Sequence, residues 1–87
     1  MPDNCLFCKI IRGEIPASKL YEDEEVLAFR DIAPQAPVHF LVIPKKHLSG
    51  PSAVNEEDER MVGKLLRVGG ELALKEGVPQ YRVVFNN

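Results

Sequence analysis

The chain has 87 residues, of which 45% are hydrophobic and 28% are charged, and its formal net charge is −2. This length allows one small domain with a modest core, and the composition is that of a globular protein. The charge argues against nucleic acid as the main partner, because the longest basic run is the pair Lys45-Lys46.

The first residues, MPDNCLFCKI, carry neither the basic region nor the long apolar run of a signal peptide. No stretch approaches the roughly 18 apolar residues that a membrane span needs. Two cysteines three positions apart do not form the disulfide framework of a secreted protein. The sequence therefore predicts a cytoplasmic protein without a membrane contact.

The first predicted elements are a short helix and a hairpin. Residues 5–13 read as a helix, with Asn4 as its cap and Gly13 just past its end. Residues 19–32 read as two strands joined by an acidic turn at 22–25, with Leu27 and Phe29 on one face. Residues 38–44 (VHFLVIP) form an almost continuous apolar run, which favours a central strand covered on both faces.

A long helix is predicted from residue 56 to Gly77, after the cap Asn55 and three acidic residues that suit the positive end of the helix dipole. Its apolar stripe consists of Met61, Leu65, Val68 and Leu72. Gly69 and Gly70 interrupt this helix at a cost of about 1 kcal/mol each relative to alanine. Either the helix tolerates them, or they allow a close approach to the sheet or to a partner helix, which is the interpretation we favour.

Residues 81–87 (YRVVFNN) predict a last strand that enters a turn. The order of elements is then helix, hairpin, strand, long helix and strand. This order predicts an α+β domain over residues 1–87 with a mainly antiparallel sheet.

Three residues could bind a metal. Cys5 and Cys8 are spaced so that both thiols point the same way on a helical turn, and His47 would complete a set of three zinc ligands. Two buried apolar cysteines, which are common in protein cores, are the more ordinary explanation of the spacing alone. A redox pair is a weaker one, because the motif does not follow a strand.

Other candidate residues are ambiguous on spacing alone. Asp31 follows an apolar strand and could accept hydrogen bonds from the two hydroxyls of a ribose, but aspartate also starts turns, and Asn86 has the same ambiguity. His39 and His47 flank the apolar strand without a nucleophile beside them. Gly69-Gly70 lacks the lysine and hydroxyl residue of a phosphate loop.

Three separated blocks resemble one family in order and spacing. The blocks FCKIIRGEIP, AFRDIAPQAPVHFLVIPKKH and YRVVFNN resemble histidine triad (HIT) proteins, and the nucleotide-binding branch most closely. The resemblance covers essentially all 87 residues. It implies a HIT-like fold with a short N-terminal helix, one long helix and a mainly antiparallel sheet.

The resemblance also implies roles for individual residues. It places a nucleotide base among Leu6, Phe7, Ile10, Phe29, Ile32 and Leu41. It assigns the ribose hydroxyls to Asp31, a position near ribose and phosphate to Asn86, and the pocket rim to Arg30. It further implies a structural zinc ion on Cys5, Cys8 and His47, with a fourth ligand from a later histidine.

The sequence departs from the family where it ends. The family's His-x-His-x-His segment and the phosphate loop before it are absent from these residues, and neither His39 nor His47 matches the nucleophile. We therefore assign no catalytic residue and expect a fragment, incomplete at the C-terminus, whose last strand has an exposed edge.

The implied function is a homodimeric domain that binds a purine nucleotide such as AMP or GMP. Its complete parent would hydrolyse nucleoside phosphoramidates, of the AMP-NH2 or AMP-lysine type, through a nucleotidyl-histidine intermediate. The two halves of the dimer would join through the long helix and the last strand. Two alternatives stay open: a non-catalytic interaction module stabilised by zinc, and a relative that hydrolyses dinucleoside polyphosphates.

Overall fold

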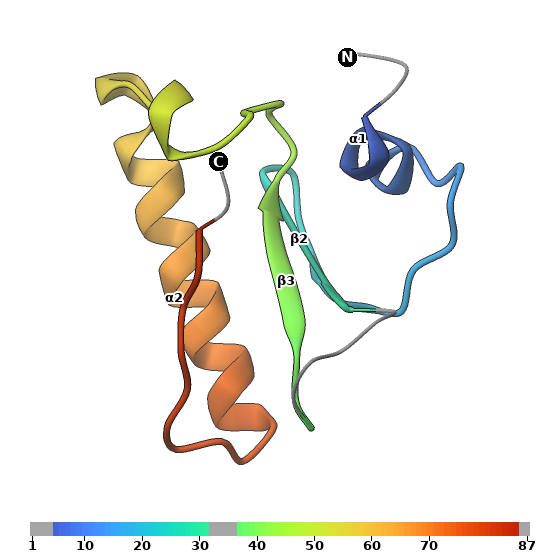
Figure 1. Cartoon of the computed structure of the whole chain (residues 1–87), viewed down its shortest axis with the longest axis vertical. Coiled ribbons are helices and arrows are strands. Elements are labelled where there is room, and N and C mark those ends of the chain that lie inside the picture. The colour runs from blue at the N-terminus through green and yellow to red at the C-terminus, as the bar shows by residue number, and fades with distance from the viewer. Residues whose placement is uncertain (1–4, 32–36, 86–87) are drawn as a thin grey trace.

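A computed structural model describes residues 5–31 and 37–85, and it shows the predicted α+β architecture (Figure 1). The elements in chain order are α1 (Leu6–Ile11), β1 (Lys19–Glu22), β2 (Val26–Arg30), β3 (Phe40–Pro44), two short 3-10 turns (Pro51–Ala53 and Glu56–Asp58) and α2 (Glu59–Lys75). The sheet lies between the two helices, with α2 on one side and α1 on the other (Figure 1).

The three strands form one antiparallel sheet in the order β1-β2-β3. The predicted hairpin is confirmed as β1 and β2. The prediction that residues 38–44 supply the central strand is wrong for the described part of the chain, where β2 lies in the middle. Four successive residues of β2, Val26–Phe29, are buried because the strand has a neighbour on each edge and a helix over each face, whereas most of β3 is only half-buried.

Alternation along the strands divides the core into two clusters. Leu27 and Phe29, with Ile43 of β3, face α1 and pack against Ile10. Val26 and Ala28 point the other way, toward Val68 and Leu72 of α2. The predicted shared face of Leu27 and Phe29 and the apolar stripe of α2 are both confirmed.

The helix ends follow the predicted signals with two differences. Gly13 and Gly77 follow α1 and α2 with positive φ angles of 79° and 72°, which glycine adopts without strain. Cys5 is the N-cap of α1, and the predicted cap Asn4 lies outside the described residues. Asn55 and Asp58 form a capping box around a 3-10 turn, so regular α-helix begins at Glu59, later than predicted.

Among the described residues, the glycine pair inside α2 makes no close approach to the sheet, which is one of the two close approaches that the sequence suggested; the approach to a partner helix stays a prediction. A Cβ added to Gly69 would lie 3.8 Å from Cγ2 of Val42, and one added to Gly70 would lie 3.5 Å from the hydroxyl of Tyr81. Both are ordinary van der Waals distances. Within the described chain, α2 therefore tolerates these glycines.

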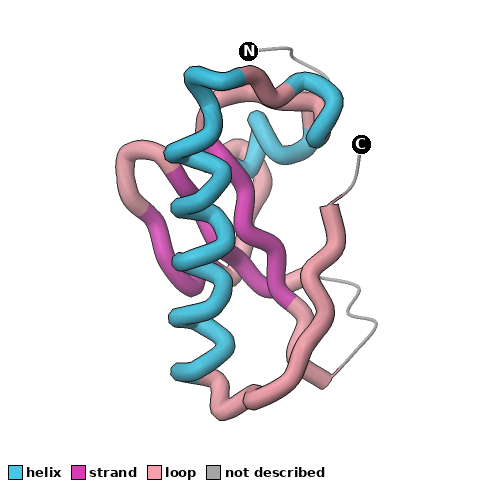
Figure 2. Tube along the Cα trace, turned by 90° about the vertical axis from the view of Figure 1, so that its left-hand side faces the viewer, coloured by secondary structure: helices cyan, strands magenta, loops and turns pink. Residues whose placement is uncertain are grey.

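Residues 81–85 form no strand, contrary to the prediction. They are drawn as a loop in Figure 2, after a turn in which the Val78 N–H donates to the carbonyl of Ala73 at 3.0 Å. A strand needs a hydrogen-bonded neighbour, and this segment has none among residues 5–31 and 37–85. Several of its apolar side chains are exposed: Tyr81, Val83, Val84 and Phe85. Among the helices described, none has the length and apolar character of a membrane span.

Candidate functional site

Cross-strand pairs build an apolar surface on the α1 face of the sheet. Leu27 lies opposite Ile43, and Phe29 lies opposite Leu41, in the antiparallel register of β2 and β3. Residues opposite one another in such a register have side chains in contact. The pairs form two apolar rungs, in which Leu27, Phe29 and Ile43 are buried and only Leu41 is half-buried.

Helix α1 adds an aromatic side chain to this surface. Ile10 is buried against the rungs, while Phe7 keeps 41% of its surface exposed. The ring centroids of Phe7 and Phe29 are 6.3 Å apart with an interplanar angle of 51°. The structure thus brings together four of the predicted base-lining residues: Phe7, Ile10, Phe29 and Leu41.

A polar pair continues the same face beyond the apolar rungs. The Asp31 N–H donates to the carbonyl of His39 at 3.2 Å, which extends the β2–β3 register by one residue. Asp31 is two residues after Phe29 and His39 two before Leu41, so both side chains belong to the face that α1 covers. Oδ2 of Asp31 lies 3.4 Å from Nε2 of His39. A carboxylate therefore stands at the end of an apolar surface.

One predicted residue, Arg30, lies away from this surface, and two others lie outside the described residues. Arg30 points to the opposite face, where Nη2 lies 2.7 Å from Oε1 of Glu76 just beyond α2. Leu6 is 55% exposed, which leaves its side chain free to meet a ligand or solvent. Ile32 and Asn86 are outside the residues that the structure describes.

The predicted metal ligands meet beside α1. The sulfur atoms of Cys5 and Cys8 and a ring nitrogen of His47 all lie within 4.8 Å of one another. Sγ of Cys8 is 3.2 Å from Nδ1 of His47, and the Cys8 N–H donates to Sγ of Cys5 at 3.3 Å. The chain folds this way because Cys5 caps α1 while His47 follows the end of β3.

Hydrogen bonding shifts the pKa values of the two thiols in opposite directions. The side chain and the N–H of Cys8 donate to Cys5 and lower its pKa. The same side-chain bond, followed by burial, raises the pKa of Cys8. The donor set of two sulfurs and one imidazole nitrogen is one that zinc accepts, and the three atoms are near enough to reach one ion with small side-chain shifts. The residues therefore fit the predicted metal.

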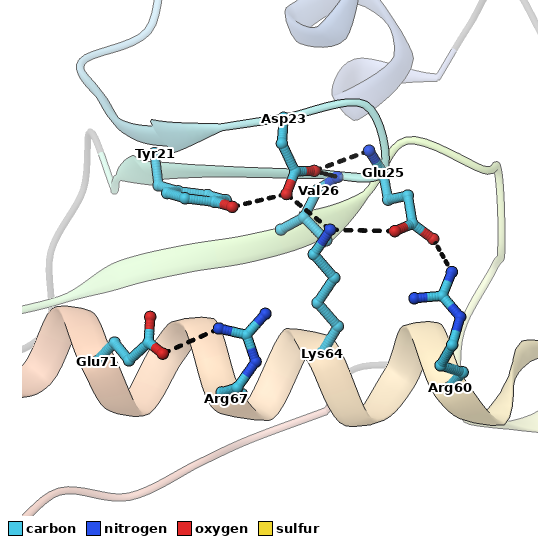
Figure 3. Close-up of polar contacts among 8 residues, drawn as sticks. All are labelled: Tyr21, Asp23, Glu25, Val26, Arg60, Lys64, Arg67 and Glu71. Atoms are coloured by element: carbon cyan, nitrogen blue, oxygen red, sulfur yellow. Dashed lines mark hydrogen bonds and ion pairs between the residues drawn. The ribbon is translucent and has the colours of Figure 1, made fainter.

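A polar network that the sequence did not predict links α2 to the β1–β2 turn (Figure 3). Oδ2 of Asp23 accepts from the hydroxyl of Tyr21 at 2.6 Å and lies 2.7 Å from Nζ of Lys64. Its Oδ1 accepts from the N–H groups of Glu25 and Val26 at 2.8 and 2.9 Å. The bond to Lys64 lowers the pKa of Asp23 most, followed by the bond from Tyr21. The sequence contains a signal for this network. Lys64 lies next to Leu65 of the predicted apolar stripe, and residues 22–25 form a predicted acidic turn.

A hollow of about 450 Å³ lies between the β1–β2 turn and the start of α2. It is lined by Glu24, Glu25, Lys46, Glu57, Asp58, Arg60 and Met61. Its charges are mostly matched within the chain, because Lys46 lies 2.6 Å from Asp58 and Arg60 pairs with Glu25. The hollow includes none of the predicted nucleotide-binding residues.

Comparison with known proteins agrees with the fold. Residues 4–87 match the family model described as scavenger mRNA decapping enzyme C-term binding. A HIT-like protein of Synechocystis is 50% identical over 88 residues, which cover 100% of this chain and 77% of that protein.

Solved structures give the same result. A HIT family hydrolase from Legionella pneumophila is 52% identical with a TM-score of 0.91, over 95% of this chain and 76% of that one. A HIT family hydrolase from Clostridium thermocellum is 38% identical with a TM-score of 0.95, over 100% of this chain and 77% of that one. The chain therefore belongs to the histidine triad (HIT) family.

Proposed function

We propose that this chain is a HIT-type nucleotide-binding domain whose ligand is a purine nucleotide such as AMP or GMP. The observation that carries the proposal is the arrangement of Phe7, Phe29 and Leu41 with Asp31 at one end. A partly exposed aromatic ring beside aliphatic side chains offers a flat base a surface to stack on. A carboxylate beside that surface offers two oxygens to a pair of ribose hydroxyls.

The base and the sugar would therefore bind in a fixed order along the face. The base would lie next to Phe7 and over Leu41, the half-buried member of the rung that pairs Leu41 with the buried Phe29. The ribose would lie one rung further along, at Asp31, because the sugar is directly bonded to the base. Since Arg30 points to the other face, we propose no contact between it and the nucleotide.

For the chemistry, we propose the hydrolysis of nucleoside phosphoramidates, as the resemblance to the nucleotide-binding branch implies. The names of two related structures support hydrolase chemistry in general. We assign no nucleophile within the described residues, since His39 faces Asp31 and His47 faces Cys8. The described side chains would bind and orient the nucleotide. The preference for one leaving group over another would depend on other residues.

Calorimetric titration of the protein with AMP tests the binding proposal. We expect Asp31→Ala to weaken AMP binding by about ten-fold or more, since hydrogen bonds to a charged group contribute about 1.5–3 kcal/mol. Glu57→Gln is a matched control, because it removes an acid at the other hollow and should leave the affinity unchanged. Equal affinities of the wild type and Asp31→Ala would remove Asp31 from the ribose role.

We also propose that Cys5, Cys8 and His47 hold a structural zinc ion. It would join α1 to the chain just beyond β3, and a bound ion stabilises the folded state over the unfolded one. It would also fix the helix that carries Phe7. The metal would thus support the nucleotide site structurally and would take no part in its chemistry.

We propose a homodimer that forms through α2 and residues 81–85. The support is exposed apolar surface on both: Leu74 is 79% exposed and Val84 is 66% exposed. Apolar side chains in such a group are typical of a protein interface. Sedimentation analysis should give a dimer that Val84→Asp converts to a monomer, and a monomeric wild type would contradict this part.

A second function is favoured by the metal cluster alone. The three candidate ligand atoms lie within 4.8 Å of one another and include no residue of the nucleotide face, so the domain could be a zinc-stabilised interaction module without catalysis. Stoichiometric zinc without turnover of adenosine phosphoramidate would favour the module. Turnover of diadenosine polyphosphates in preference to phosphoramidates would instead favour the relative that cleaves pyrophosphate bonds.

A further inference from the structure

We infer that Cys5 and Cys8 form a redox switch, in which a peroxide converts the two thiols to a disulfide that excludes the metal ion and disturbs the nucleotide face. The inference rests on the proposed function for these two effects, but the disulfide itself is measured without either ligand. From spacing alone a redox pair was the weaker explanation of the cysteines, because the motif does not follow a strand. The geometry of α1 supports it.

The two sulfur atoms are close, and the backbone can bring them closer. They belong to the group of ligand atoms that all lie within 4.8 Å of one another, and the Cys8 N–H donates to Sγ of Cys5 at 3.3 Å. A disulfide needs Cβ atoms about 3.5–4.5 Å apart, whereas residues three positions apart on a helix have them about 5–6 Å apart. Cys5 is the N-cap, with φ −83° and ψ 115°, so its dihedral angles can change without unwinding Leu6–Ile11.

The two thiols differ in exposure, which assigns their roles. Cys8 is only 1% exposed, whereas Cys5 is half-buried. A peroxide in solution therefore reaches the sulfur of Cys5 first, because oxidation depends on access. The sulfur of Cys8 lies beside it and is placed to attack in a second step. Cys5 is thus the residue that the peroxide oxidises, and Cys8 is the residue that resolves the product.

Two steps account for every atom and electron. The Cys5 sulfur attacks one peroxide oxygen, so that an S–O bond forms as the O–O bond breaks, and the thiol proton leaves with the second oxygen as water. The Cys8 sulfur then attacks the Cys5 sulfur, so that the S–S bond forms as the S–O bond breaks, and the hydroxyl leaves with the Cys8 proton as a second water. The two sulfurs together lose two electrons, which the peroxide accepts. A thiol reductant reverses the change.

The disulfide and the metal ion exclude each other. Zinc binds cysteine as the thiolate, and a disulfide sulfur has neither that charge nor a hydrogen to donate. Nδ1 of His47 lies 3.2 Å from Sγ of Cys8 in the reduced chain. On oxidation His47 would lose both the thiol and the shared metal that join it to α1. Apolar packing, such as that of Ile10 against the sheet, would still hold the helix.

The same disulfide acts on the nucleotide face, because Phe7 lies between the two cysteines in the sequence. Phe7 is 41% exposed, and its ring centroid is 6.3 Å from that of Phe29. A bond between the residues on either side of Phe7 turns the backbone that carries this ring. The oxidised chain should therefore bind AMP about two- to ten-fold more weakly than the reduced chain, which is the range for one aromatic contact.

The test treats the reduced, metal-free chain with hydrogen peroxide and maps the cysteines by mass spectrometry in the wild type, Cys5→Ser and Cys8→Ser. We expect the wild type to lose both free thiols within one chain, and dithiothreitol to restore them. Cys8→Ser should carry a sulfenic acid on Cys5 that dimedone traps, whereas Cys5→Ser should react at least about ten-fold more slowly. Circular dichroism shows whether each variant is folded. Wild-type thiols that stay free, disulfides that form only between chains, or equal rates in the two variants would overturn the inference.

Zinc release and AMP titration separate this inference from the proposed function. The zinc-loaded wild type should release its metal as the disulfide forms, and calorimetry should show weaker AMP binding by the oxidised chain. A reduced chain that fails to bind zinc or AMP refutes that part of the proposed function, together with the effect of the disulfide on it. If the reduced chain binds both, and the disulfide-bonded chain retains zinc or binds AMP equally well, only the switch is refuted.

Discussion

The ammonium group of Lys64 on α2 lies 2.7 Å from Oδ2 of Asp23, in the turn between β1 and β2. The same nitrogen lies 3.0 Å from Oε1 of Glu25, and the Lys64 side chain is only 17% exposed. This contact joins the hairpin to the long helix at one end of the sheet (Figure 3). It therefore holds the α2 layer in place, on the side opposite the proposed nucleotide face.

The Asp23 network predicts how stability depends on pH. Its hydrogen bonds lower the pKa of Asp23 in the folded chain below the value of 3.8 that is ordinary for aspartate. The folded state therefore binds fewer protons than the unfolded state, and the gain in stability is complete above that ordinary value and is lost as the pH falls below it. We expect Asp23→Asn to be less stable than the wild type at pH 7, with a difference that shrinks as the pH falls below about 4.

Urea unfolding at several pH values measures this difference. Glu24→Gln is the control, because it removes a charge of the same sign from the same turn without touching the bonds of Asp23. A difference between the wild type and Asp23→Asn that stays constant from pH 7 to pH 3 would contradict the account.

The proposed zinc site predicts a selective loss of metal. We expect one zinc ion per chain in the wild type and in His39→Gln, and less in His47→Gln, because a site of this kind depends on each ligand. Cys8→Ser should lose zinc in the same way. Chelation should lower the melting temperature of the wild type but not that of Cys8→Ser. Elemental analysis and a thermal melt measure both effects, and equal metal in both histidine variants would count against the site.

The glycines of α2 predict a gain of stability on substitution. We expect Gly69→Ala to raise the free energy of unfolding by up to about 1 kcal/mol, because alanine has the higher helix propensity and the added Cβ makes an ordinary contact. Gly63→Ala is the comparison, since nothing lies within 4 Å of a Cβ there. A clear loss of stability or of dimer in Gly69→Ala alone would show that a partner approaches this glycine closely.

The core beneath the proposed site predicts a large effect of one truncation. Leu27 has no exposed surface and packs with Phe29 and Ile10. Leu27→Ala should lower the free energy of unfolding by about 2–5 kcal/mol, whereas Leu66→Ala, at a position that is 50% exposed, should change it by less than about 0.5 kcal/mol. Chemical denaturation checks both. Similar effects at the two positions would contradict the assigned packing.

The sequence predicted the elements whose signals are local. Gly13 and Gly77 end their helices as expected, and the stripe with Val68 and Leu72 faces the sheet. The metal cluster was also predictable in part, because the Cys5–Cys8 spacing is local even though His47 is distant. These features depend on short stretches of chain, which carry their own propensities.

The errors concern relations between distant segments. The apolar run at residues 38–44 indicated burial but not the position of its strand, since strand order depends on which neighbours pair. Residues 81–85 have strand propensity but no partner among the described strands. Lys64 and Asp23 are in contact although they lie 41 positions apart in the sequence, so no local pattern specifies the contact.

The central claim is that a nucleotide binds on the α1 face of the sheet, between Phe7 and Asp31. Nuclear magnetic resonance of the nitrogen-15-labelled protein, titrated with AMP, tests it most directly because each backbone amide reports separately. The account predicts that the largest shifts occur at Phe7, Phe29 and Asp31, while Met61 at the acidic hollow stays unchanged. Shifts that concentrate around Met61, or no shifts at saturating AMP, would contradict it.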